Sequence, residues 1–353
     1  MINLIHTLEP TTMTILPTYQ CTAACKECCF ECNQQRSGRI SLTNLLSYID
    51  DACESFNSLQ MIVFSGGECF LLGDDLISAV QKANYYKKKV RCVSNGYWAP
   101  NKKAAVARLK PLIDAGLTEL NLSTGDEHQE WVPIQNIINA AIVGAELGIQ
   151  VVITVEGSKE ASFKYQELIV QPEIKDFLEN NASSSNIKII ENVWISFHAN
   201  KNYTHNKNTY RTASIVKKLE GCNNIFNNIV INPREEMISC CGLTFEHIPE
   251  LHNGSLKKNR MKELYLKQFS DFMKIWIWVD GPESILYFAS QKNDAIKYTG
   301  DYVHPCQTCV LIHNRKDVKE TLLKHYHEKV NDVLFRYVLK KEIRKTDLLL
   351  LNN

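Results

Sequence analysis

Short apolar runs alternate with segments of helical period from Met13 to about Trp194, and this alternation restricts the folds open to the chain. The expected strands are Met13–Leu16, Met61–Phe64, Val90–Val93, Glu119–Leu122, Val151–Val155 and Ile187–Trp194. The expected helices between them are Leu42–Ser55, Asp74–Tyr86, Asn101–Ala115 and Pro133–Leu147. Such an alternation predicts an α/β fold of βαβ units around a parallel sheet. Six expected strands favour a partial (β/α)6 barrel of the TIM type over a complete one of eight strands.

The alternation ends near residue 200, and a second region is expected to follow. Two β runs around Asn232-Pro233 predict a hairpin, and helical segments are expected near Met261–Phe272 and Glu283–Ala289. Apolar residues at every fourth position predict one amphipathic helix over Val318–Leu339. We therefore expect a barrel domain at 1–204, a small α+β domain at 205–315 and a C-terminal amphipathic helix at 316–353.

Composition and charge narrow the class of protein. The chain has 353 residues, a net charge of +1 and 44% hydrophobic residues, so neither nucleic acid nor membrane is expected as a partner. The opening "MINLIHTLEP" lacks the pattern of a secretory signal, so we expect a cytoplasmic protein. In that reducing compartment, thirteen cysteines indicate metal or redox chemistry rather than disulfides.

The first cysteine cluster, "CTAACKECCFEC", follows the first expected strand. Cys21, Cys25 and Cys28 have the spacing Cys-x3-Cys-x2-Cys, and three thiolates on one loop can hold three irons of a cubane. The fourth iron is then open for a reaction, as the open position is in catalytic zinc sites. The alternative from spacing alone is a zinc site at Cys25, Cys28 and Cys32.

This motif resembles that of the radical S-adenosylmethionine (SAM) superfamily. The resemblance implies that Cys21, Cys25 and Cys28 bind a [4Fe-4S] cluster, whose open iron is chelated by the amino and carboxylate groups of SAM. Phe30 stands near the place of an aromatic residue beside SAM in that family, although Cys29 displaces the usual order. Cys29 and Cys32 are expected to be buried apolar residues, or else to lie near the substrate.

Later stretches at expected strand ends resemble further motifs of the same superfamily. Gly66-Gly67-Glu68 resembles a Gly-Gly-Glu turn that contacts the SAM amino group, and Ser94-Asn95 begins a stretch like Thr-Asn-Gly. "LSTGDEHQEWVP" is similar to a Ser-x-Asp-x-x-His stretch, but Gly125 replaces the usual Asp. The resemblance implies that cofactor-binding residues are Phe30, Gly66, Gly67, Glu68, Ser94, Asn95, Ser123, Asp126 and Thr154.

A second group of cysteines resembles the auxiliary-cluster domains called SPASM and twitch, found in the peptide-modifying branch. The resemblance implies an auxiliary cluster, [4Fe-4S] or [2Fe-2S] with the former favoured, at Cys222, Cys240, Cys306 and Cys309. Cys241 is the substitute ligand, and Glu235 stands where the related hairpins have Gly. Zinc at the same thiolates, or separate buried cysteines, are the alternatives.

The resemblance implies reductive cleavage of SAM to a 5′-deoxyadenosyl radical, followed by hydrogen-atom abstraction from a substrate C–H bond. We expect a ribosomally made peptide as substrate, an external low-potential electron donor, and a separate leader-binding protein or C-terminal leader site. The enzymatic alternative is a maturase acting on a small molecule such as a sugar, nucleoside or cofactor precursor. The non-enzymatic alternative is a zinc-binding interaction module.

Overall fold

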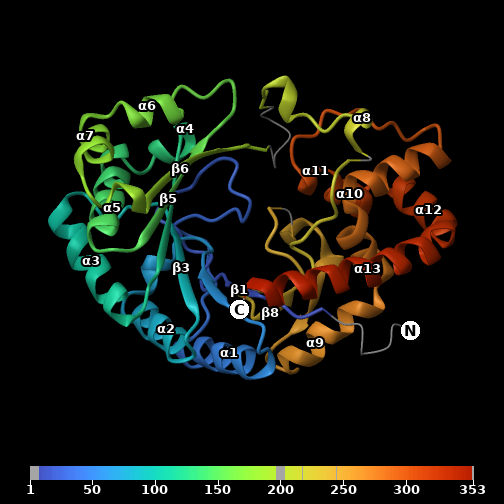
Figure 1. Cartoon of the computed structure of the whole chain (residues 1–353), viewed down its shortest axis with the longest axis horizontal. Coiled ribbons are helices and arrows are strands. Elements are labelled where there is room, and N and C mark those ends of the chain that lie inside the picture. Colours follow the sequence, from blue (N-terminus) through green and yellow to red (C-terminus); the bar gives the residue numbers. More distant parts are fainter. Residues whose placement is uncertain (1–7, 196–202, 217, 244, 352–353) are drawn as a thin grey trace. The chain divides into compact units, whose positions relative to one another are not determined.

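The structure is a computed structural model that describes residues 8–195, 203–216, 218–243 and 245–351 (Figure 1). The expectation about an export signal falls largely on residues 1–7, outside the described residues. The chain forms two compact units. The barrel unit is Thr11–His205 with Val230–Glu236, and the second unit is Met1–Pro10, Asn206–Ile229 and Met237–Asn353. The C-terminal helices thus fall in the same compact unit as residues 206–229 and do not form a unit of their own. The predicted division into three domains stays a prediction.

Six strands of the barrel unit stand side by side in chain order. Each pairs in parallel with the next, as the alternating pattern predicts. Their bounds are β1 (Thr12–Ile15), β2 (Met61–Phe64), β3 (Lys89–Ser94), β4 (Glu119–Thr124), β5 (Gln150–Glu156) and β6 (Ile187–Asn192). The predicted partial barrel is therefore confirmed, and its strand ends share one edge where loops can meet.

Helices cover the outer side of these strands (Figure 1). The helices of the barrel unit are α1 (Leu42–Ser55), α2 (Asp74–Tyr85), α3 (Lys102–Ala115), α4 (Asp126–Gln129), α5 (Ile134–Glu146), α6 (Tyr165–Ile169) and α7 (Pro172–Asn180), with 3-10 turns η2 (Cys69–Leu72) and η3 (Ser184–Asn186). Ser41 caps α1 by accepting a hydrogen bond from the Asn44 N–H at 3.2 Å. Gly116 ends α3 in the left-handed region at φ 118°. Serine and glycine are residue types that favour these helix-end positions.

The predicted hairpin around Asn232-Pro233 is formed by β7 (Asn228–Ile231) and β8 (Glu236–Ile238). Its tip belongs to the barrel unit, where the Leu16 N–H donates to the Ile231 carbonyl at 2.8 Å. Glu235 has φ 62°, in the left-handed region that glycine adopts without steric cost. Its buried carboxylate accepts hydrogen bonds from Asn44 Nδ2 and Tyr48 Oη, both at 2.6 Å. Those two bonds oppose the backbone strain at Glu235.

The second unit is mostly helical. Its helices are α8 (Ala213–Val216), α9 (Met261–Lys267), α10 (Phe272–Lys292), α11 (Pro305–Asn314), α12 (Lys316–His325) and α13 (His327–Leu351), beside strand β9 (His252–Ser255) and 3-10 turns η4 (Lys207–Thr209), η5 (Phe245–His247), η6 (Pro249–Leu251) and η7 (Gln268–Ser270). Helix α10 buries Trp276 and Trp278 and is kinked at Gly281. Over the described residues, none of the helices combines the length and apolarity that crossing a bilayer requires.

The prediction of one continuous helix over Val318–Leu339 is wrong, because α12 ends at His325 and α13 begins at His327. Positions four apart advance about 400° around a helix, so a four-residue repeat drifts steadily off one face. Among the residues whose burial is described, the buried apolar ones are Val318 and Leu322 in α12 but Val333 and Tyr337 in α13. The break thus lets each helix bury a different register of apolar residues.

We expect Glu235→Ala to lower the free energy of unfolding by about 2 kcal/mol, because the Tyr48 hydroxyl and Asn44 amide lose a buried acceptor. Glu235→Gly loses the same carboxylate but relieves the positive φ, so it should be more stable than the Ala variant by about 1 kcal/mol. Urea unfolding of the three proteins measures both differences. A Gly variant no more stable than the Ala variant would mean that no strain is held at this turn.

Candidate functional site

The loop after β1 carries Cys21, Cys25 and Cys28 as free thiols. Cys21 is buried with Tyr19, Ala23 and Cys32, and the partly buried Cys25, Cys28 and Phe30 pack against this group. Because this loop follows β1, it starts at the carboxyl end of a barrel strand, where the active-site loops of such barrels lie. The structure brings together the three predicted ligands and the predicted aromatic residue.

Two of the three sulfur atoms accept hydrogen bonds that fix them. Cys21 Sγ accepts from the Ala23 N–H at 3.4 Å and from Asn95 Nδ2 at 3.6 Å. Cys28 Sγ accepts from the Cys32 N–H at 3.4 Å. The donor is the Cys32 backbone, while the Cys32 side chain is buried, as predicted, and that of Cys29 is only half-buried.

The electrostatics of the loop differ from one thiol to the next. Burial raises the pKa of Cys21 and of Cys25 to about 12. Hydrogen bonding by Cys32 lowers the pKa of Cys28 to about 6. Binding of iron requires thiolates, so metal uptake by this loop must displace protons from Cys21 and Cys25.

The Gly66-Gly67 turn after β2 lies directly against the cysteine loop. The Gly67 N–H donates to the Thr18 carbonyl and the Glu68 N–H to the Gln20 carbonyl, both at 2.9 Å. A Cβ on Gly67 would overlap the Gln20 carbonyl oxygen and lie 2.7 Å from its carbon. Glycine is thus required here by contact with the chain itself, one residue before Cys21.

Glu68 is fully buried, and burial raises its pKa to about 7. Its carboxylate accepts hydrogen bonds from the Phe70 N–H at 3.0 Å, the Asn95 N–H at 2.8 Å and Ser94 Oγ at 3.0 Å. These bonds join the turn after β2 to the end of β3. The predicted contact of Glu68 with the SAM amino group stays a prediction.

Asn95 extends this network to the cysteine loop. Besides Cys21 Sγ, its side-chain amide donates to Thr22 Oγ1 at 3.0 Å. Ser94 Oγ accepts from Trp98 Nε1 at 2.9 Å, and Trp98 stacks on Phe70 with ring centroids 4.5 Å apart. The predicted residues of three consecutive strand ends therefore form one bonded group. Their contact with a cofactor stays a prediction.

The predicted residues at the ends of β4 and β5 have separate positions. Ser123 and Thr154 are register partners, so they are neighbours on adjacent strands. Asp126 accepts from the N–H groups of Ser162 at 2.7 Å and Phe163 at 2.9 Å, so its carboxylate holds a loop of the chain. Gly125 has φ 147°, and a Cβ there would lie 2.6 Å from the Glu156 Cβ, which explains why no Asp occupies this position.

The second group of cysteines lies within the second unit. Cys240, Cys306 and Cys309 are buried, and a Cβ on Gly242 would lie 2.9 Å from Cys240 Sγ and 3.0 Å from Cys306 Sγ. Burial, and then the nearby Cys222, Cys241, Cys306 and Cys309, raise the pKa of Cys240. The structure thus brings the four predicted ligands near one another, while Cys241 Sγ contacts Asn224 Oδ1 at 3.7 Å.

The donor chemistry of both groups fits iron–sulfur clusters, since each offers several largely buried cysteine thiols, none of which is in a disulfide. Within the described part of the chain, no three His, Cys, Asp or Glu side chains are placed to hold a single metal ion. A cubane differs from a single ion because each cysteine binds a different iron.

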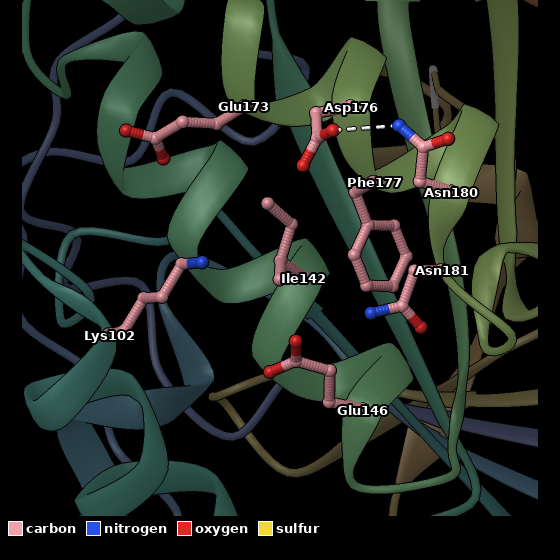
Figure 2. Close-up of a pocket in the computed structure, with 8 residues that line it drawn as sticks. All are labelled: Lys102, Ile142, Glu146, Glu173, Asp176, Phe177, Asn180 and Asn181. Atoms are coloured by element: carbon pink, nitrogen blue, oxygen red, sulfur yellow. Dashed lines mark hydrogen bonds between the residues drawn. The ribbon is translucent and has the colours of Figure 1, made fainter.

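Two hollows of the surface are lined by residues outside the cysteine loop after β1. One, of about 210 Å³, lies among α3, α5 and α7 and is lined by Lys102, Ile142, Glu146, Glu173, Asp176, Phe177, Asn180 and Asn181 (Figure 2). The other, of about 570 Å³, is in the second unit beside Cys222 and is lined by Glu220, Gly221, Asn223, Asn227, Val279, Lys340 and Ile343. Neither contains a predicted site residue.

We expect Gly67→Ala to destabilise the barrel unit by about 1–3 kcal/mol, the usual effect of overpacking, and to lower the iron content after reconstitution. The reason is that the new methyl group displaces Gln20, next to Cys21. Gly148→Ala is the control for a loss of stability without a clash, because Gly148 has φ 91°, which is unfavourable for Ala, but no atom within 4 Å of an added Cβ. Iron analysis and urea unfolding measure both effects, and equal iron in both variants would contradict the account of the turn.

The burial of His128 makes the free energy of unfolding depend on pH. Its Nδ1 is buried although the residue is partly exposed, its ring packs on Trp194 with centroids 5.3 Å apart, and burial lowers its pKa from 6.5 to about 4. Between these values the unfolded chain binds a proton that the folded chain does not, so stability is lost as the pH falls below 6.5.

We therefore expect the contribution of His128 to the free energy of unfolding to fall by about 1 kcal/mol between pH 8 and pH 5.5. His128→Gln should show a correspondingly smaller decrease in urea unfolding over that range. Equal decreases in the two proteins would show that His128 does not titrate as the buried geometry requires.

Comparison with known proteins gives one curated relative in sequence. YydG of Bacillus subtilis (strain 168), which is named as a peptide biosynthesis protein, is 24% identical over 152 residues. The match covers 42% of this chain and 47% of YydG, so the chain spans about half the length of that relative. No protein-family profile matches the chain.

Solved structures match over much more of the chain. Native anSMEcpe with bound AdoMet, which is SAM, has 14% identity and a TM-score of 0.52, covering 92% of this chain and 99% of its own. The same enzyme with bound AdoMet and the Cp18Cys peptide has 13% identity and a TM-score of 0.51, covering 92% and 99%. These likenesses confirm the predicted resemblance at the level of the fold. The chain has the fold of the radical SAM enzymes.

Proposed function

We propose that the chain is a radical SAM enzyme whose Cys21, Cys25 and Cys28 hold a [4Fe-4S] cluster. The proposal is carried by the hydrogen bonds that join the cysteine loop to the Gly66-Gly67 turn and to Asn95. These three segments follow the carboxyl ends of β1, β2 and β3. When bound, the cluster supplies the electron that cleaves SAM to a 5′-deoxyadenosyl radical, which takes a hydrogen atom from the substrate.

The chain's own residues prepare that chemistry by fixing the ligands. Asn95 holds Cys21, and Cys32 holds Cys28, through hydrogen bonds to their sulfur atoms. Such bonds tune the reduction potential of a cluster as well as its position. The buried Glu68 holds the turn and Asn95 together, so one change there would disturb the whole loop.

The second unit is proposed to hold an auxiliary [4Fe-4S] cluster at Cys222, Cys240, Cys306 and Cys309. The proximity of Cys240 and Cys306 at Gly242 supports this set. The contact of Cys241 with Asn224 favours Cys240 over Cys241 as the ligand from this pair. Four protein thiolates close the coordination of a cluster, which suits electron transfer rather than SAM binding.

A ribosomally made peptide is the proposed substrate. The relative YydG is named for peptide biosynthesis, and anSMEcpe was solved with a bound peptide, which supports this class. A low-potential electron donor and a separate leader-binding protein are the proposed partners. A small molecule remains the second candidate, and a neighbouring gene for a short peptide would discriminate between the two.

Replacing Cys21, Cys25 and Cys28 together by Ala should abolish reductive cleavage of SAM, because no ligand of the first cluster remains. The triple variant should keep about four irons per chain, the content of one cubane, in the second unit. The measurements are 5′-deoxyadenosine under anaerobic reducing conditions, and iron, sulfide and zinc per chain.

Undiminished 5′-deoxyadenosine from the triple variant would overturn the assignment of the first cluster. A variant without residual iron would overturn the auxiliary cluster. Zinc without iron in the wild-type protein would favour the zinc-binding module instead.

A further inference from the structure

The peptide between Cys25 and Cys28 is attached to α4 through one residue, Lys26. Its backbone N–H donates to Glu127 Oε2 at 2.9 Å, and its side-chain Nζ pairs with Glu130 Oε1 at 2.7 Å. Both carboxylates come from the segment that follows β4. One residue of the cysteine loop therefore has two acidic partners, one in α4 and the other at its C-cap.

The two carboxylates differ in their surroundings. Glu127 is only 2% exposed, whereas the side chains of Lys26 and Glu130 are 64% and 48% exposed. A hydrogen bond from a backbone N–H to a buried carboxylate is strong, while an exposed ion pair contributes little. Glu127 is therefore the partner that fixes the loop, and Glu130 offers a natural comparison.

The Glu127 carboxylate is held beside the ligand Cys25. Its hydrogen-bond donor, the Lys26 N–H, belongs to the residue that directly follows Cys25 in the chain. Tyr203 Oη also lies 3.4 Å from Glu127 Oε1. A negative charge held this close to a ligand opposes the addition of an electron to a cluster on that ligand.

We propose that Glu127 is a positioning residue that holds the Cys25–Cys28 segment and whose carboxylate lowers the reduction potential of the cluster bound there. The proposal rests on the proposed function, since it concerns the cluster of the same loop. A lower potential makes the reduced cluster a stronger reductant, which cleavage of SAM requires. Sequence reasoning selected the preceding residue, Asp126, but not Glu127.

The test compares Glu127→Gln with Glu130→Gln in the reconstituted full-length protein. The amide of the first variant keeps the shape and one acceptor oxygen for the Lys26 N–H but removes the charge. We measure iron per chain and then the midpoint potential of the reduced-cluster signal that changes when SAM is added, by redox titration followed by electron paramagnetic resonance.

The expected result is wild-type iron in both Gln variants, a more positive midpoint potential in Glu127→Gln and an unchanged potential in Glu130→Gln. Glu127→Ala, which also removes the acceptor, should lose iron relative to Glu127→Gln. A wild-type potential in Glu127→Gln, or an equal shift in Glu130→Gln, would overturn the proposal while leaving the cluster assignment intact. A wild-type protein with no SAM-responsive signal would overturn the proposed function itself.

Discussion

The backbone hydrogen bonds between the turn after β2 and the cysteine loop are the constraint on which the rest of the site depends. They require glycine at position 67, since any Cβ there overlaps the Gln20 carbonyl. They also carry Glu68 into the interior, where its carboxylate gathers Ser94 and Asn95. Asn95 then reaches back to Cys21 and Thr22. The first three strand ends are thus bonded into one closed ring of contacts before any cofactor is considered.

Much of the fold and of the site could be predicted from the sequence because the signals for them are local. Parallel strands that are buried on both faces are apolar runs, so β2 was predicted with its observed bounds and β1, β3, β4 and β5 within about two residues. Helix ends carry local signals, as at Ser41 and Gly116. The cysteine spacing and the glycine pair are likewise local, since each motif occupies a few consecutive positions. Their order along a βαβ chain then places them at one edge of the sheet.

What could not be predicted depends on contacts between distant residues. Glu235 adopts a positive φ because Asn44 and Tyr48, about 190 residues earlier, bind its carboxylate, and no local signal encodes that bond. Glu127 binds Lys26 across the barrel edge, so its importance is invisible in the short stretch around it. The break between α12 and α13 follows from the different faces that each helix buries, whereas the four-residue repeat alone favoured one helix.

The central claim is that one iron of the cluster on Cys21, Cys25 and Cys28 is left for SAM. Electron–nuclear double resonance on the reduced protein, with SAM labelled at its amino nitrogen and carboxylate oxygens, tests this most directly. The account predicts magnetic coupling of both labels to the cluster signal, as direct ligation of one iron requires. A reduced cluster whose signal shows no coupling to either label, at saturating SAM, would contradict it.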